Sequence, residues 1–309
     1  MLGALLDRYL LEELPDLRHS TASAYRSYAE NHIRPKWSDY GISDIKPFAV
    51  EEWLKKLDLA AKSKGQIRTI MRSLFNSAMR WELIQLGENP MKLVRVRGIS
   101  KREREPRVLT LAEFQSLLRY IEDEPFRTMV LLDIATGLRA SELLALKWCD
   151  VNWSELTLSV RRAIVDDVTD DVKTKSSKAG LPLDPDLGEL LLAWKSATEF
   201  NRDEDWVFAS PFHGGEKPYR AWGVQQWRIR PAAVLAGLGK GVGWHTFRHT
   251  FRTLLDEIGA PLKVQQELMR HADIRCMGRR WTRASAARKA RSCAWCLPGH
   301  RARNCPIAP

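Results

Sequence analysis

A twelve-residue segment, residues 244–255, constrains the fold and chemistry of this chain more than any other stretch. Its sequence is WHTFRHTFRTLL, in which His245 and Arg248 lie three residues apart and His249 follows directly. In a helix this spacing places His245 and Arg248 on one face, while aromatic and leucine side chains pack behind them. Two imidazoles and a permanent cation directed at one point suit an anion, and the best candidate is a phosphate.

A second segment, residues 135–148, also places an arginine beside apolar residues, and its sequence is ATGLRASELLALKW. Arg139 follows a glycine turn and precedes an apolar stretch, so we expect a helix over 140–147. A lone arginine at a helix start is commonly a surface residue. Two features favour a functional role here. Gly137 permits a tight turn that fixes where the arginine joins the helix, and Glu142 can hold its guanidinium in place.

These segments, with the sequence ELMRHADI at residues 267–274, resemble the catalytic domain of the tyrosine recombinases, the phage-integrase family. In that family an arginine in a G-L-R-x-x-E-L motif, a β-hairpin lysine and an H-x-x-R pair surround the scissile phosphate. A further His or Trp and a nucleophilic tyrosine follow. The resemblance extends over about residues 1–275. It implies the catalytic residues Arg139, Lys173, His245, Arg248 and His271, with Lys175 and Lys178 as alternatives to Lys173.

The resemblance also implies a fold, a reaction and partners. The expected fold is mainly α with a small antiparallel β-sheet: an N-terminal helical core-binding (SAM-like) domain, then a tyrosine-recombinase catalytic domain. The implied reaction is a metal-free transesterification of a DNA phosphodiester, without a cofactor, that serves site-specific recombination or integration of a mobile element. Arginines stabilise the pentavalent phosphate, histidines donate hydrogen bonds or move protons, and the lysine protonates the leaving oxygen. The implied partner is double-stranded DNA, on which the family forms a homo-oligomer, a tetrameric synapse.

Apolar periodicity predicts the domain organisation. Residues 1–97 are expected to form the helical DNA-binding domain, 98–108 a charged linker without periodicity, 109–275 the catalytic domain and 276–309 a basic tail. In the first domain the predicted helices are 2–14, 20–33, 48–59 and 64–81. The boundary between the catalytic domain and the tail, at residue 275, rests on composition as well as on periodicity, because the residues from 276 onward contain no acid.

The predicted helix over 64–81 has a basic stripe opposite its apolar face. Lys64, Arg68 and Arg72 follow one another at intervals of four residues, so they share one side of the helix. Such a stripe is often a solvated helix face. Beside the resemblance, contact with DNA phosphates is the favoured interpretation, because the family's N-terminal bundle clamps the duplex.

The second domain is expected to combine helices with a few short strands. Thr110 and Glu113 form a predicted capping box, and Asp166 with Asp167 makes a predicted turn between strands. A strand is expected over 156–160, and further helices over 127–135, 186–200, 222–238 and 262–269. Trp222 and Trp227 are expected in the core rather than as platforms that stack on bases.

Composition limits the class of protein. The net charge is +11, but residues 276–309 hold seven Arg, one Lys and no acid, so the rest of the chain carries +3. The total charge is therefore weak evidence for nucleic-acid binding. No apolar run reaches the length of a membrane span, and acids interrupt residues 1–14, so a cytoplasmic protein is expected. The five cysteines do not indicate a disulfide framework.

The chain departs from the family pattern after His271. Its six tyrosines all precede that residue, and Arg280 and Trp281 stand where the nucleophile is expected. Neither side chain can attack phosphorus. Because the composition also changes abruptly, we hypothesise that a deletion with a frameshift removed the tyrosine and left a cleavage-deficient recombinase. The alternatives are a non-catalytic DNA-binding protein that occupies recombination sites, or a degraded pseudogene product.

The tail contains one further pattern. Cys293, Cys296, His300 and Cys305 follow a spacing one residue short of a C-x2-C-x4-H-x4-C zinc knuckle. Near-miss spacings also arise by chance in sequences rich in cysteine and arginine. No metal is assigned, and zinc binding by the tail stays open.

Overall fold

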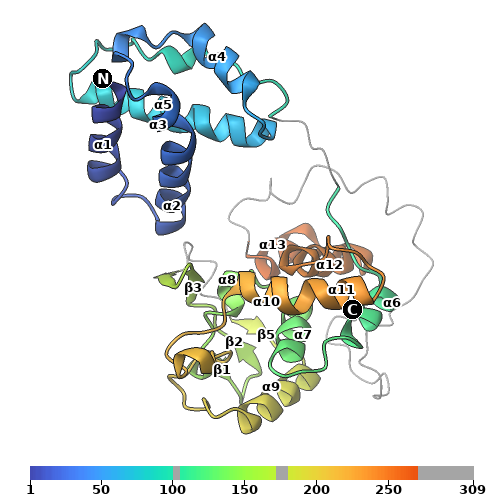
Figure 1. The fold of residues 1–309 in the computed structure, drawn as a ribbon. Coiled ribbons are helices and arrows are strands. Elements are labelled where there is room, and N and C mark those ends of the chain that lie inside the picture. The colour runs from blue at the N-terminus through green and yellow to red at the C-terminus, as the bar shows by residue number, and fades with distance from the viewer. Residues whose placement is uncertain (100–104, 172–179, 271–309) are drawn as a thin grey trace. The chain divides into compact units, whose positions relative to one another are not determined.

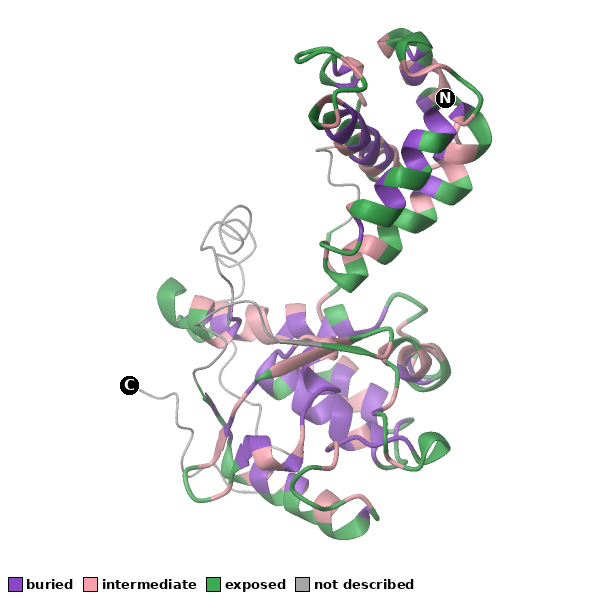
Figure 2. Ribbon diagram, turned by 90° about the vertical axis from the view of Figure 1, so that its left-hand side faces the viewer, coloured by how far each residue is buried: buried purple, intermediate pink, exposed green. Residues whose placement is uncertain are grey.

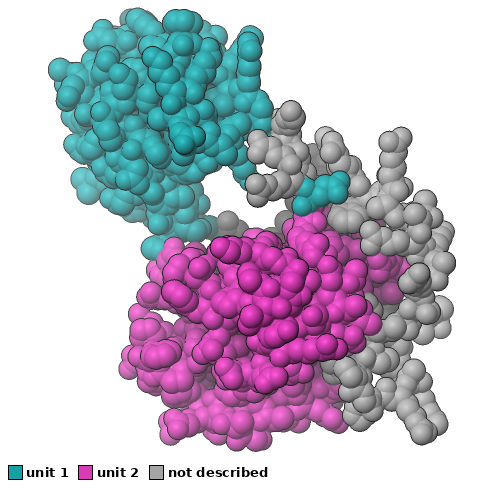
Figure 3. Space-filling model, turned by 45° about the vertical axis from the view of Figure 1, so that its right-hand side comes forward, with its two compact units in different colours: residues 1–105 teal, residues 106–309 magenta. Residues whose placement is uncertain are grey.

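The computed structural model describes residues 1–99, 105–171 and 180–270. The chain forms two compact units, residues 1–105 and 106–309 (Figure 3). The division falls inside the predicted linker over 98–108. Within the described ranges no helix is both long enough and apolar enough to cross a membrane.

The first unit is helical, and its elements enclose one apolar core (Figure 1). They are α1 (Leu2–Glu12), α2 (His19–Tyr28), the π-helix η1 (Ala29–Ile33), α3 (Arg34–Trp37), the 3-10 helix η2 (Ile42–Asp44), α4 (Pro47–Lys56), α5 (Ala61–Arg80) and the 3-10 helix η3 (Pro90–Lys92).

Helix α5 provides the largest share of this core. The apolar residues predicted to share one face are almost all buried, from Ile67 through Leu74 to Ala78. Tyr9 on α1 is buried beside them, and its hydroxyl donates a hydrogen bond to Ser73 of α5 at 2.9 Å. The spacing of apolar residues therefore predicted both the helix and its buried side.

The second predicted helix has different ends from those expected. It was predicted to stop before Pro35, but the helical path continues from α2 through η1 into α3. Pro35 is the second residue of α3 and directly follows the π-helical turn η1. Arg34 reinforces the junction by bonding to Glu30 and Asp7 at 2.6 and 2.7 Å.

The second unit is mostly helical in its described part. The helices there are α6 (Leu111–Leu118), α7 (Phe126–Thr136), α8 (Ala140–Leu143), η4 (Trp148–Asp150), α9 (Pro185–Ala197), η6 (Pro211–His213), α10 (Ala221–Val224), the π-helix η7 (Gln225–Ile229), α11 (Arg230–Leu235), α12 (Trp244–Glu257) and α13 (Leu262–Leu268). Helix α7 packs against α8, α9 and α12. The predicted capping box is present: the Glu113 amide donates to Thr110, and the Thr110 amide donates to Glu113. Helix α8 ends at Leu143, four residues earlier than the predicted helix over 140–147.

Two small antiparallel sheets lie in the described part of this unit. Strands β1 (Val151–Asn152), β2 (Thr157–Leu158) and β5 (Leu181–Pro182) pair in the order β1-β2-β5, and β3 (Arg162–Val165) pairs with β4 (Val168–Asp171). Asp166 and Asp167 form the predicted turn of the second hairpin, both at positive φ. The predicted fold class, mainly α with small antiparallel sheets, is confirmed.

Helices α7 and α12 form the centre of this unit. Nine of the eleven residues of α7 are buried, so this helix is purple over most of its length in Figure 2. The buried face of α12 carries Phe247 and Leu255. Because α7 ends where α12 packs against it, residues at the end of α7 lie close to residues in the first half of α12.

Candidate functional site

The first predicted arginine lies at the turn between α7 and α8. Gly137 ends α7 with φ of +59°, and a Cβ there would overlap the ring of Phe251. Arg139 then precedes α8, and its Nη1 donates to Oε1 of Glu142 at 2.7 Å while its backbone amide donates to Oε2 at 2.9 Å. The Arg139 side chain is still 42% exposed. The turn thus holds a guanidinium that is fixed at one edge and open at the other.

The second predicted arginine approaches the same turn from α12. Arg248 is 7% exposed, and its guanidinium donates to the backbone carbonyls of Gly137 and of Met269, the latter at 2.5 Å. Burial, with the nearby charge of Arg139, lowers the pKa of Arg248 to about 10. At neutral pH the group is still cationic, so two positive charges meet at the end of α7.

The predicted histidines occupy more open positions. His245 is exposed one turn before Arg248, and its ring centroid lies 6.5 Å from that of the half-buried His249. Lys173 and His271, the remaining predicted catalytic residues, lie outside the described residues. The described structure therefore brings Arg139 and Arg248 together and places His245 on the same helix as Arg248.

Two buried charged residues of this site were not predicted as site residues. Arg270, just after α13, is 3% exposed and donates to Oε2 of Glu142 at 2.6 Å. Asp133, inside α7, is fully buried and has no hydrogen-bond partner among the described residues. One sequence signal was available: an acid within the otherwise apolar run MVLLDIA of residues 129–135.

Burial and charge act against each other on these groups. Burial raises the pKa of Asp133 well above 3.8, although the charges of Arg248 and Arg270 oppose the rise. Burial also acts to raise the pKa of Glu142, but the charge of Arg270 and the bonds from Arg139 outweigh it, so that pKa is lowered. Burial lowers the pKa of Arg270, against the attraction of Glu142. Glu142 is therefore the ionised carboxylate that the arginines share.

We expect the replacement Asp133→Asn to change how stability depends on pH. The folded state binds the Asp133 proton more tightly than the unfolded chain does, because its pKa is raised. This group therefore becomes increasingly destabilising as pH rises from the unfolded pKa to the folded one. Urea unfolding of both proteins from acidic to neutral pH should show the variant gaining relative stability across that window. If the free energies of unfolding of the two proteins changed with pH in parallel, that result would contradict an elevated pKa of Asp133.

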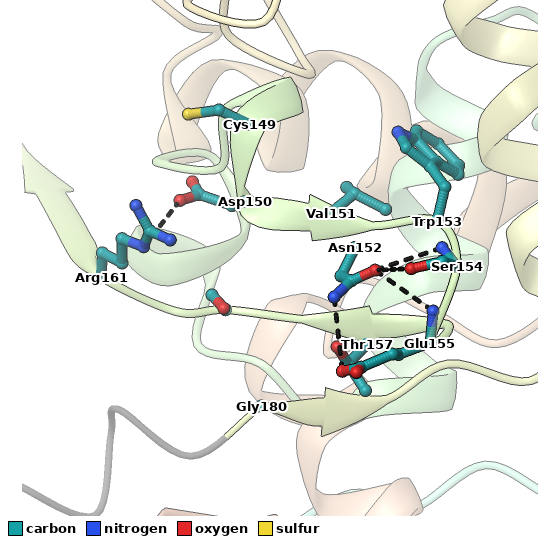
Figure 4. Close-up of a pocket in the computed structure, with 11 residues that line it drawn as sticks. Cys149, Asp150, Val151, Asn152, Trp153, Ser154, Glu155, Thr157, Arg161 and Gly180 are labelled. Atoms are coloured by element: carbon teal, nitrogen blue, oxygen red, sulfur yellow. Dashed lines mark hydrogen bonds and ion pairs between the residues drawn. The ribbon is translucent and has the colours of Figure 1, made fainter.

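A pocket of about 860 Å³ lies elsewhere in the second unit, beside strands β1 and β2 (Figure 4). Neither Arg139 nor Arg248 lines it. Its polar groups largely satisfy one another: Oδ1 of Asn152 accepts from the backbone amides of Ser154 and Glu155, both at 3.1 Å. This hollow is therefore separate from the arginine site.

The basic stripe on α5 is only partly available to a ligand. The ammonium of Lys64 donates to the carbonyl of Lys55 at 3.2 Å, and the guanidinium of Arg68 donates to the carbonyl of Val94 at 3.3 Å. Both side chains are half-buried, whereas Arg72 is exposed. Two members of the stripe thus also hold neighbouring backbone segments in place.

The prediction that Trp222 and Trp227 lie in the core is wrong. Each is 68% exposed, and their rings meet edge to face with centroids 6.5 Å apart. The predicted helix over 222–238 is divided by η7, a π-helix, which changes the side-chain phase expected from regular helical spacing.

The sequence matches the family model described as "Phage integrase family" over residues 107–288, more than half of the 309 residues. The chain belongs to the phage integrase family. Residues 1–57 match the model described as "Phage integrase, N-terminal SAM-like domain". The first match extends past residue 275, the predicted end of the catalytic domain.

Curated relatives of this phage integrase family member carry recombinase names. It is 30% identical to "Tyrosine recombinase XerD" of Chlorobaculum tepidum, with 75% of this chain and 73% of the relative covered. It is 26% identical to "Tyrosine recombinase XerC-like" of Caldanaerobacter subterraneus subsp. tengcongensis, with 88% and 76% covered. Both alignments extend over most of each protein.

Solved structures of integrases share the fold. The Tn1549 transposon integrase in complex with transposon right end DNA superposes with a TM-score of 0.76 at 20% identity, over 92% of this chain and 96% of that one. A lambda integrase dimer bound to a core site gives 0.68 at 21% identity, over 91% and 98%. At this level of identity the likeness establishes the fold of the phage integrase family.

Proposed function

We propose that this protein binds duplex DNA as a tyrosine recombinase or integrase of a mobile element, and that this copy does not cleave it. The proposal rests on one observation: the guanidiniums of Arg139 and Arg248 are both held at the end of α7. Two fixed cations at one partly open point suit the non-bridging oxygens of a phosphodiester. The names of the relatives and the DNA in the neighbouring complexes support the same class of ligand.

The proposed roles follow from where each group lies. Arg139 has an exposed edge that can contact a phosphate oxygen, while Arg248 adds positive charge from a buried position. The exposed His245 can donate a hydrogen bond from the next turn of α12. We assign protonation of the leaving oxygen to Lys173 and a further phosphate contact to His271, as the family resemblance implies. The arginine charges stabilise the phosphate, so the proposal requires no metal.

Cleavage requires a nucleophile that this sequence does not place after His271. The chain's six tyrosines are Tyr9, Tyr25, Tyr28, Tyr40, Tyr120 and Tyr219. A DNA-binding protein that occupies recombination sites without cutting them is therefore the second candidate function. The two well-formed apolar cores favour either function over a degraded product that barely folds. On DNA we expect the protein to form a homo-oligomer.

A nicked duplex that traps covalent intermediates tests the proposal. The protein is incubated with the attachment site of its own element, and the products are separated on denaturing and native gels. We expect a shifted complex on the native gel and no covalent protein–DNA band on the denaturing gel. A covalent band would show that some residue serves as nucleophile, and absence of any complex would refute DNA binding.

Within the basic stripe, Arg72 should contribute most to DNA binding. Replacing the exposed Arg72 with alanine should weaken binding several-fold and lower the slope of log affinity against log salt by about one. Arg68→Ala should mainly destabilise the first unit, because it releases the carbonyl of Val94. Fluorescence anisotropy at several salt concentrations measures the affinity, and urea unfolding measures the stability of Arg68→Ala.

The matched control for that experiment is Arg80→Ala. It removes the same charge from the same helix, but Arg80 already pairs with Glu13. Equal losses for Arg72→Ala and Arg80→Ala would mean that overall charge, not the stripe, attracts DNA.

A further inference from the structure

We propose that Arg270 is a positioning residue of the arginine site: its buried guanidinium holds Glu142, and through Glu142 it fixes Arg139. The proposal rests on the proposed function in taking a DNA phosphate as the ligand. It adds a third arginine to the site, one that acts without touching the DNA.

The backbone of Arg270 is in a conformation that disfavours an arginine. Its φ is +50°, in the left-handed region where Cβ crowds the following carbonyl oxygen and which glycine adopts freely. The side chain is nevertheless 1% exposed. A bulky residue persists in such a conformation when surrounding contacts hold it there. We infer that contacts of the buried guanidinium, which a glycine could not make, stabilise this conformation.

That contribution is a bridge to Glu142. Oε2 of Glu142 accepts from Nη2 of Arg270 at 2.6 Å and from the backbone amide of Arg139 at 2.9 Å. Oε1 accepts from Nη1 of Arg139 at 2.7 Å. One carboxylate is therefore shared by two guanidiniums. Because three guanidiniums, those of Arg139, Arg248 and Arg270, surround the single ionised carboxylate of Glu142, the cluster keeps an excess of positive charge for an anion.

Asp133 gives a second, independent reason for the position of Arg270. Both carboxylate oxygens of Asp133, and Nε and Nη1 of Arg270, are buried without hydrogen-bond partners among the described residues. Burial raises the pKa of Asp133, and the nearby charges of Arg248 and Arg270 oppose that rise. The charge of Arg270 therefore acts on both buried acids, Glu142 and Asp133, and its removal takes away that effect from each.

Titration of Glu142 tests the bridge without DNA. In uniformly 13C-labelled protein, the Glu142 carboxyl signal is identified by its loss in Glu142→Gln. The replacement Arg270→Gly should raise the pKa of Glu142 by roughly one pH unit or more, and Arg270→Lys should keep it near the parent value. An unchanged pKa in Arg270→Gly would overturn the proposal. If that variant does not fold, Arg270→Gln gives the same comparison.

A matched glycine variant separates the effect of the Arg270 side chain from the effect of relieving its backbone strain. Glu82 is an exposed residue with φ of +58°, so Glu82→Gly relieves the same kind of backbone strain without removing a buried charge. Its melting temperature should hold or rise. That of Arg270→Gly should fall by roughly 4 °C or more. A rise in both variants would show that the buried Arg270 side chain does not stabilise the fold.

DNA affinity then tests whether Arg270 affects binding by positioning Arg139. Arg270→Gly should weaken binding to duplex DNA roughly tenfold, whereas adding it to Arg139→Ala should weaken binding no further. Fully additive losses would overturn an action through Arg139. If the parent protein binds no duplex DNA, the proposed function fails, and the Glu142 titration still decides the role of Arg270.

Discussion

Replacing Gly137 with alanine is expected to lower the free energy of unfolding of the second unit by about 3 kcal/mol or more. The left-handed backbone at φ of +59° disfavours a Cβ, and this Cβ would overlap the ring of Phe251. The ring cannot move away freely, because α7 and α12 pack against each other at this point. The displaced turn would also carry away the carbonyl that accepts a bond from Arg248. Urea unfolding followed by circular dichroism measures the loss.

Gly214 provides the control for that substitution. It has nearly the same backbone conformation, with φ of +55° after the short helix η6, but a Cβ there would meet no atom within 4 Å. Gly214→Ala should therefore lose only the backbone contribution, about 1 kcal/mol. Equal losses at the two positions would mean that the contact with Phe251 does not matter.

The replacement Arg248→Ala is expected to destabilise the second unit by about 3–5 kcal/mol and to abolish measurable DNA binding. It would leave the carbonyls of Gly137 and Met269 without this donor. It would also remove a cation that compensates the buried Asp133. Arg248→Lys keeps the charge but cannot reach both carbonyls with a planar fork, so it should recover only part of either loss.

His245→Ala is the matched control on the same helix. Because His245 is exposed one turn earlier, its loss should change stability by less than about 0.5 kcal/mol while still weakening DNA binding. A stability loss as large as that of Arg248→Ala would contradict the division between a buried and an exposed site residue. Anisotropy and urea unfolding on the same samples give both measurements.

Local patterns were the most predictable part of this structure. The capping box of Thr110 and Glu113 and the bond from Arg139 to Glu142 each join residues three apart, so sequence spacing alone indicated them. The buried face of α5 followed from apolar periodicity in the same way. The family motifs predicted the fold class and placed Arg139 and Arg248 in one site.

Contacts between distant parts of the chain were not predictable in this way. Arg270 and Glu142 are 128 residues apart, and no local pattern indicates that a buried carboxylate in one segment will meet a cation in the other. Trp222 was misassigned for a different physical reason. A large aromatic side chain is usually buried, but the ring of Trp222 is 68% exposed and meets that of Trp227 edge to face.

The double role of Arg248 has a consequence for how genes of this kind evolve. The same buried guanidinium that adds positive charge for a phosphate also ties the end of α7 to the chain after α13. A copy that had stopped cutting DNA would therefore remain under selection to keep this arginine for as long as a folded protein was useful. Retained arginine motifs in a genome record the demands of folding as well as those of catalysis. Surveys that sort active from retired recombinase genes should weight the nucleophile more heavily than the arginines.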